Sequence, residues 1–250
     1  MINSILAWLG DTAHWQGDDG ILRRLIEHVE YSLVALLIAA LIAIPLGLYI
    51  GHTGRGRFLV VNTLGAARAI PTLGLLFLAV LLLGPRLSGD IAFLAPAGLV
   101  LVVLAIPPIL TGAYAGVESV EPAVRDAAVG MGMRGTEVLR HVELPCALPL
   151  ILSGLRSAML QVIATATIAA VVGLGGLGRF LIDGLSVRDT PQTASGAILV
   201  AVLALFVDMV LALVQRSVVS PGLTGRYGKV SSTDANGGTA IQTPALQQIL

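Results

Sequence analysis

Long apolar stretches alternate with shorter polar segments along this chain. Five stretches are apolar over the roughly 20 residues that an α-helix needs to cross a bilayer: residues 29–50, 58–83, 91–110, 150–174 and 194–214. Lipid offers no hydrogen-bond partners to backbone N–H and C=O groups, so each stretch is expected to be helical. The pattern predicts an all-α, polytopic membrane protein with about five transmembrane helices.

The two ends of the chain differ from this apolar middle. Residues 1–28 are mixed, and their Trp8 and Trp15 are typical of a membrane interface. We therefore expect an interfacial segment at 1–28, a transmembrane domain at 29–216 and a polar, disordered cytoplasmic tail at 217–250. The first apolar stretch is too long for a signal peptide and is expected to remain uncleaved.

Composition supports a membrane location and excludes several classes of function. The 250 residues are 56% hydrophobic and 12% charged, whereas soluble domains have about 25% charged residues. The net charge of zero gives no support for binding nucleic acid. The single cysteine, Cys146, and four scattered histidines lack metal-ligand spacing, and the histidines are interpreted as surface or interface residues. No cofactor or metal is expected on this chain.

One polar segment, residues 117–147, interrupts the apolar pattern for longer than a simple connection requires. Pro122 is suited to the first turn of a short helix, and Gly132 permits a turn after it. A second short helix is expected at 134–141. Pro145 and Pro149 are expected to stop it from continuing into the fourth span. Two short helices joined by glycine would form a rigid projection, although an ordinary amphipathic loop would fit the same pattern.

The segment also carries a spaced motif, formed by Asp126, Ala127, Ala128, Gly132, Val142, Leu144 and Pro145, with Arg134 between its two parts. It resembles the docking loop of binding-protein-dependent ABC importer permeases, written Glu-Ala-Ala-x3-Gly-x9-Ile-x-Leu-Pro. Asp126 replaces the usual Glu and Val142 replaces Ile. The resemblance implies that this loop lies in the cytoplasm and docks an ABC ATPase subunit.

Further runs narrow the resemblance to permeases for osmoprotectants such as glycine betaine, choline, carnitine or proline betaine. These runs include Ile44-Pro45-Leu46-Gly47, Pro107-Pro108-Ile109-Leu110 and Glu143-Leu144-Pro145-Cys146-Ala147-Leu148-Pro149. The chain departs from the family at Arg68-Ala69, where Gln-Thr is common, and at Thr111-Gly112-Ala113, where Arg-Asn-Thr is common. The resemblance covers roughly residues 29–220 and implies a methionine-permease-like core in a bacterial cytoplasmic membrane. It also implies a second permease subunit and an extracytoplasmic solute-binding protein.

Two alternative functions remain at this point: a permease for methionine or another small solute, and a membrane scaffold without a transport pathway. The only lysine, Lys229, lies outside any P-loop spacing, so ATP hydrolysis is expected on a separate subunit and this chain is not expected to be an enzyme. The G-x-G-x-x-G match at 173–178 follows a predicted span instead of a strand. We interpret it as a turn before a short helix near 180–185.

Ionisable side chains within spans are costly and usually face protein, water or a partner. Arg156 and Asp208 are expected at similar depth, which predicts a structural ion pair between the fourth and fifth spans. Arg68, Ile70, Pro71 and Thr72 are candidates to line the pathway, because a proline kink frees backbone polar groups. Alternatively, Arg68 extends toward the membrane surface.

Overall fold

The computed structural model describes residues 1–58 and 71–219, and the regular secondary structure within these ranges is helical. The α-helices are α1 (Ile2–Gly10), α2 (Ile21–Thr53), α4 (Thr72–Leu83), α5 (Ile91–Glu118), α6 (Pro122–Gly130), α7 (Gly135–Val138), α8 (Leu144–Ala169), α9 (Gly178–Val187) and α10 (Thr190–Val218). Short 3-10 turns lie at Thr12–Trp15, Gly84–Arg86 and Ala170–Val172, and a π-helical turn, η3, lies at Leu139–Glu143. The all-α prediction is confirmed.

Four helical segments in the described residues are long and apolar enough to cross a membrane: Ile21–Thr53, Ile91–Glu118, Gly135–Val172 and Thr190–Val218. They confirm the first, third, fourth and fifth predicted spans. The second prediction, 58–83, falls partly outside the described residues. Its described part, α4, has 12 residues and is too short to cross alone, since a span needs about 20. Residues 59–70 of the second predicted span and the expected tail beyond residue 219 lie outside the described residues.

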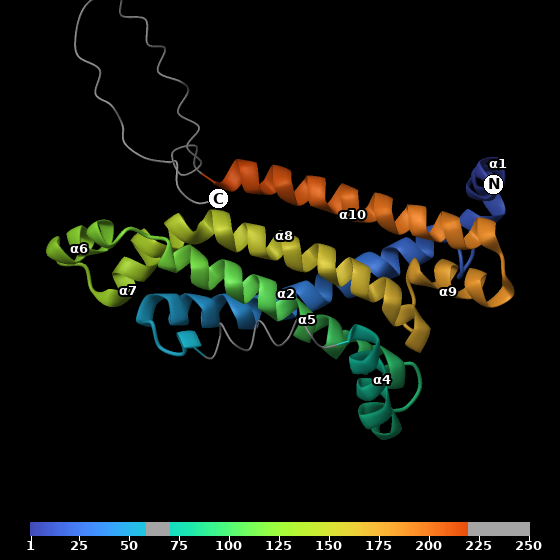
Figure 1. Cartoon of the computed structure of the whole chain (residues 1–250), viewed down its shortest axis with the longest axis horizontal. Helices are drawn as coiled ribbons and strands as arrows, with labels where there is room; N and C mark the ends of the chain where they lie inside the picture. The colour runs from blue at the N-terminus through green and yellow to red at the C-terminus, as the bar shows by residue number, and fades with distance from the viewer. Residues whose placement is uncertain (59–70, 220–250) are drawn as a thin grey trace, which may run out of the picture.

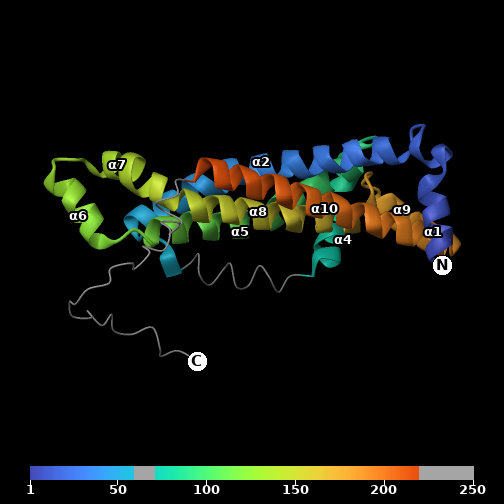
Figure 2. The same ribbon diagram turned by 90° about the horizontal axis from the view of Figure 1, so that it is seen from above.

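Three long helices, α2, α5 and α8, lie side by side along the molecule, with α5 between the other two (Figures 1 and 2). α5 buries a stripe at every fourth position, formed by Ala97, Leu101, Ala105, Ile109 and Ala113, each with no exposed surface. A four-residue spacing places these side chains on one helix face. The core therefore sits along α5, between α2 and α8.

Small residues bring the backbones of these helices together. A Cβ on Gly112 of α5 would lie 2.5 Å from the Leu150 carbonyl oxygen of α8, and one on Gly154 would lie 2.7 Å from the Pro108 carbonyl oxygen. A Cβ on Gly47 of α2 would lie 2.6 Å from Ala113. Close backbone approach at small residues is the usual way in which helices associate in lipid. The α5–α8 contact and the α2–α5 contact both lie in the half of the bundle nearer to α6.

α10 runs along the outside of this group (Figure 1). Only 6% of its most apolar window is buried, and Leu205, for example, is 71% exposed. Its polar attachments to α8 include Gln215 Nε2, which donates to the Pro149 carbonyl oxygen at 3.1 Å. In a membrane this apolar outer face would contact lipid or another subunit.

The expected break before the fourth span is wrong. Helical structure continues from α7 through η3 into α8, and it passes both prolines. Pro145 follows directly on the π-helical turn, and its missing N–H removes one backbone hydrogen bond from this continuous stretch. Pro149 removes one backbone hydrogen bond inside the helix, which the long, packed α8 tolerates. The segment that ends in Glu143 is therefore joined rigidly to a transmembrane helix.

The two ends of the bundle carry different elements. α6 and α7 extend beyond the long helices at one end, and α1 and α9 lie at the other (Figure 1); these are called the α6 end and the α9 end. α2 begins at Ile21 instead of Val29, so the expected border at residue 28 falls inside it. α9, at Gly178–Val187, confirms the short helix predicted near 180–185.

Candidate functional site

The predicted docking motif forms a helical projection at the α6 end. α6 begins with Pro122 in its first turn and ends at Gly130. Asp126 and Ala127 are exposed, whereas Ala128 is 2% exposed and faces the rest of the loop. The side chain of Ala128 therefore packs inward, whereas the small side chain of Ala127 leaves a shallow surface beside Asp126.

Gly132 closes α6 through backbone hydrogen bonds that require a left-handed residue. Its φ is +89°. Its N–H donates to the Val129 carbonyl oxygen at 2.9 Å, and the Met133 N–H donates to the Ala128 carbonyl oxygen at 3.2 Å. This pair of bonds is a Schellman motif, in which glycine at the left-handed position avoids a Cβ clash. The motif glycine thus sets the direction in which the chain leaves α6.

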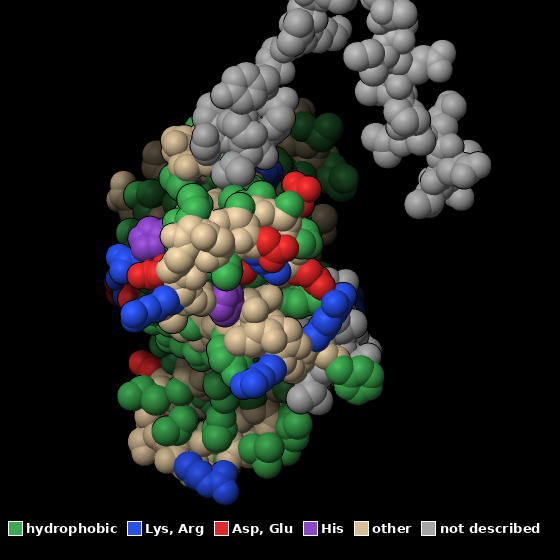
Figure 3. All heavy atoms as spheres, turned by 90° about the vertical axis from the view of Figure 1, so that its left-hand side faces the viewer, with side chains coloured by type: hydrophobic (Ala, Val, Ile, Leu, Met, Phe, Trp, Pro, Cys, Tyr) green, Lys and Arg blue, Asp and Glu red, His purple; other side chains and the backbone are tan. Residues whose placement is uncertain are grey.

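The outer face of the projection is apolar and uncovered. Val124 is 44% exposed, Val129 is 58% exposed and Met131 is 73% exposed. Figure 3 shows this end of the molecule, where acidic and basic side chains lie among the hydrophobic ones. An apolar surface on a polar, projecting loop is typical of a site that contacts another protein.

The second half of the motif connects the projection to α8. Arg134 is the N-cap residue of α7, and its backbone N–H donates to Glu137 Oε2 at 2.7 Å. Val142 and Leu144 are half-buried, and Pro145 is exposed in the first turn of α8. All eight predicted loop residues therefore lie in one unit, in which α6 is joined by the turn at Gly132 to the helical stretch that continues into α8.

A buried carboxylate that the sequence did not single out holds this unit in place. Glu143 is 2% exposed. Its Oε2 lies 2.6 Å from Nδ1 of His52 in the last turn of α2, and its Oε1 lies 3.0 Å from Nε of Arg125 in α6. Arg125 also donates to the carbonyl oxygen of Val117, near the end of α5. Glu143 and Arg125 together therefore connect α6 with the ends of α2 and α5.

Two of the four histidines make long-range contacts, and one of them, His28, departs from the surface or interface position expected for it. His52 contacts Glu143, and His28 has no exposed surface, with Nε2 lying 3.1 Å from the Ile163 carbonyl oxygen. Both contacts join residues far apart in sequence. No local signal marks them, and only the polar character of histidine in an apolar helix could have raised the question.

The predicted ion pair is present. Arg156 of α8 donates from Nε and one Nη to the two carboxylate oxygens of Asp208 in α10. Both side chains are partly exposed, 37% for Arg156 and 24% for Asp208. The two-point geometry of a guanidinium and a carboxylate is directional, so the pair fixes how α10 lies on α8.

Comparison with known proteins decides the family. The sequence model of the "binding-protein-dependent transport system inner membrane component" family matches residues 43–220. The chain belongs to this family. The match includes the whole projection and the helices that carry it, so the permease has an ATPase and a solute-binding protein as partners, and ATP is hydrolysed by the separate ATPase.

Curated relatives cover most of the permease. It is 33% identical over 199 residues to the glycine betaine/carnitine/choline transport system permease protein OpuCB of Bacillus subtilis, covering 80% of this chain and 88% of that one. It is 34% identical over 206 residues to the osmoprotectant import permease protein OsmW of Salmonella typhimurium, covering 80% and 94%. Choline transport system permease protein OpuBB of Bacillus subtilis is 32% identical, covering 81% and 90%.

Solved structures show the same fold. The permease superposes on a chain of the MetNI methionine ABC transporter, in an inward-facing conformation, with a TM-score of 0.70 and 20% identity. The match covers 80% of the permease and 97% of that chain. This likeness concerns the fold alone. It confirms the multi-pass, membrane-embedded architecture inferred from the apolar stretches.

The predicted pathway residues are only partly described. Arg68 and Ile70 lie outside the described residues. Pro71 is exposed and precedes α4, whose first residue, Thr72, is half-buried. A pathway role for these four residues stays a prediction.

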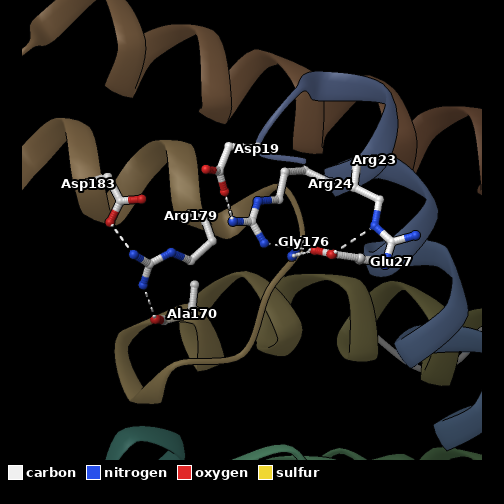
Figure 4. Close-up of polar contacts among 8 residues, drawn as sticks. All are labelled: Asp19, Arg23, Arg24, Glu27, Ala170, Gly176, Arg179 and Asp183. Atoms are coloured by element: carbon white, nitrogen blue, oxygen red, sulfur yellow. Dashed lines mark hydrogen bonds and ion pairs between the residues drawn. The ribbon is translucent and has the colours of Figure 1, made fainter. Parts of the chain in front are cut away.

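A second polar cluster lies at the α9 end of the permease (Figure 4). Glu27 of α2 accepts from Arg24 at 2.9 Å and from the Gly176 backbone N–H at 3.0 Å, and it lies 3.3 Å from Arg23. Arg179 and Asp183 of α9 form a neighbouring pair at 2.7 Å. The turn between α8 and α9 is therefore fastened to α2.

Proposed function

We propose that this permease imports small osmoprotectants, such as glycine betaine or choline, in an ATP-driven system. Two findings together support the proposal: the family match over residues 43–220, and the 32–34% sequence identity to relatives that transport these solutes. The likeness to the methionine transporter rests on 20% identity and carries no argument about the solute. A scaffold without a pathway is disfavoured by the same family membership.

The α6 projection is proposed to dock the ATPase. The exposed apolar side chains of Val124, Val129 and Met131 would enter a cleft of the ATPase, with Asp126 at the edge of the contact. The rigid turn at Gly132 supports this role, because a preorganised surface loses less entropy on binding. Nucleotide-driven closure of two ATPases would then displace the projections of two permease subunits and change which side of the membrane the pathway faces.

This assignment places the α6 end in the cytoplasm and the α9 end outside. An exposed cysteine introduced at Ser186, on a Cys146→Ser background, should react with a membrane-impermeant reagent in intact cells. A cysteine at Thr136, which is also exposed, should react only after the membrane is opened. The reverse labelling pattern would refute the orientation.

The solute-binding protein is proposed to set most of the selectivity, since it delivers the solute to the permease. Quaternary ammonium groups are recognised by cages of aromatic side chains, and this chain is only 4% aromatic. The test is ATPase activity of the complex in lipid nanodiscs. Binding protein loaded with glycine betaine or choline should stimulate it more than binding protein given methionine. Equal stimulation by all three would remove the osmoprotectant assignment.

A further inference from the structure

Glu143 is the only buried carboxylate in the described parts of the permease. Its two oxygens face in different directions, one toward His52 at 2.6 Å and one toward Arg125 at 3.0 Å. A buried carboxylate is tolerated when it is paired and hydrogen-bonded, and losing either partner is unfavourable. Exposed ion pairs open and close at little cost, whereas this arrangement resists opening. The contacts of Glu143 with His52 and Arg125 therefore form a fixed connection, which is called the joint below.

The joint lies where a displacement of the projection would reach the bundle. Arg125 is in α6 itself, next to Asp126, and it also donates to the Val117 carbonyl oxygen of α5. Glu143 ends the π-helical turn that continues directly into α8, and such turns are often found at functional sites. α6 is therefore tied to α5 and α8 as well as to α2.

α2 carries the connection to the opposite end of the molecule. It has 33 residues, which corresponds to about 50 Å of helix. His52 lies in its last turn, and Glu27 near its start accepts from the Gly176 N–H in the turn between α8 and α9 (Figure 4). A helix fastened at both ends moves both attachments together.

We propose that Glu143 is a positioning residue that makes α2 follow the docking helix, so that displacement of α6 by the ATPase reaches the turn at Gly176. This inference rests on the proposed function, because it takes α6 as the ATPase contact. It assigns a role in energy coupling to His52, Arg125 and Glu143, which lie outside the apolar docking face.

The variant His52→Ala cuts the α2 side of the joint, and Arg125→Ala cuts the α6 side and also removes the bond to the Val117 carbonyl oxygen. His52 is 26% exposed and Arg125 is 28% exposed, so both should fold and bind the ATPase. The purified complex is placed in proteoliposomes, and the amount of glycine betaine imported per ATP hydrolysed is measured. Each variant should lower this ratio about 5- to 10-fold, within the usual range of coupling between sites.

Two comparisons separate coupling from ordinary structural support. The double variant His52→Ala/Arg125→Ala should be no worse than Arg125→Ala alone, because that variant already cuts the connection from α6 to α2. The matched control is Arg57→Ala, which breaks an exposed pair with Glu118 (2.9 Å) at the same end of the bundle and should leave the ratio unchanged. Glu143→Gln keeps the shape and should retain part of the coupling.

A second measurement does not depend on the solute. A spin label at Ser186, near the α9 end, should change mobility when ATP is added to the wild-type and Arg57→Ala complexes, and it should not respond in His52→Ala. A response at Ser186 without glycine betaine uptake would place the error in the proposed solute and leave the joint standing. The role of Glu143 would be overturned if His52→Ala showed the wild-type spin-label response and the wild-type ratio of glycine betaine imported to ATP hydrolysed. Strictly additive losses in the double variant would overturn it as well.

Discussion

Replacing Gly132 with alanine should weaken ATPase binding through the backbone alone. Gly132 has a φ of +89°, and no atom lies within 4 Å of the position that its Cβ would take. The added methyl group therefore meets no neighbour. Its cost is conformational, about 1–2 kcal/mol for an L-residue in the left-handed region. The free permease avoids this cost by leaving the turn, and the turn must then be restored, at about that cost, when the ATPase binds.

Gly130→Ala is the matched control. Gly130 is the last residue of α6 and also has open space at its Cβ position. Gly132 is among the glycines with positive φ, whereas Gly130 is not. Alanine at a right-handed helical position should be neutral or stabilising, by up to about 1 kcal/mol. The two variants thus differ in backbone geometry and in little else.

The assay is equilibrium binding of the ATPase to the permease in nanodiscs. A cost of about 1–2 kcal/mol corresponds to about 5- to 30-fold weaker binding for Gly132→Ala. Gly130→Ala should bind as the wild type does. Equal affinities for the two variants would refute the argument that the Schellman turn at Gly132 presents the docking surface.

Three other substitutions test how the bundle is held together. Asp208→Ala should lower the thermal midpoint and folded yield, because it leaves Arg156 without its partner; strictly additive effects in a double-mutant cycle would show that the two do not interact. Gly154→Ala should lower the midpoint, because its Cβ would lie 2.7 Å from a backbone oxygen and overpacking costs about 1–3 kcal/mol. The control is Gly98→Ala, whose Cβ would lie in open space. Equal midpoints for the two variants would contradict the close crossing of α5 and α8. Arg188→Gly should raise the midpoint, because Arg188 has a φ of +60° that glycine adopts without strain; an unchanged or lower midpoint would contradict this.

The spans were predictable because lipid leaves the backbone no alternative to helix. Their ends were not, because hydropathy falls at charged residues whereas the helix continues. Glu27, which lies before the predicted start of the first span, belongs to α2 because its charge is paired with Arg24 and Gly176. The expected stop at Pro149 failed for a related reason: packing and lipid maintain a helix that local propensity would break.

The candidate site was predictable where its chemistry is local. The Schellman turn at Gly132 depends on neighbouring residues, so spacing in the sequence marked it. The Arg156–Asp208 pair was also accessible, because depth in the membrane can be counted along each helix. The contact between Glu143 and His52 joins residues 91 positions apart, and it depends on how α2 packs against α8. Nothing in the local pattern of either residue indicates the other.

Uptake of labelled glycine betaine into proteoliposomes tests the central claim most directly. The vesicles should contain the permease with its ATPase, and ATP and the solute-binding protein should be supplied on opposite sides of the membrane. The account predicts that labelled glycine betaine accumulates against a gradient and that this accumulation requires both ATP and the binding protein. Excess unlabelled choline or glycine betaine should reduce the accumulation, and excess methionine should not. ATP-dependent accumulation of methionine, with no accumulation of either quaternary amine, would contradict it.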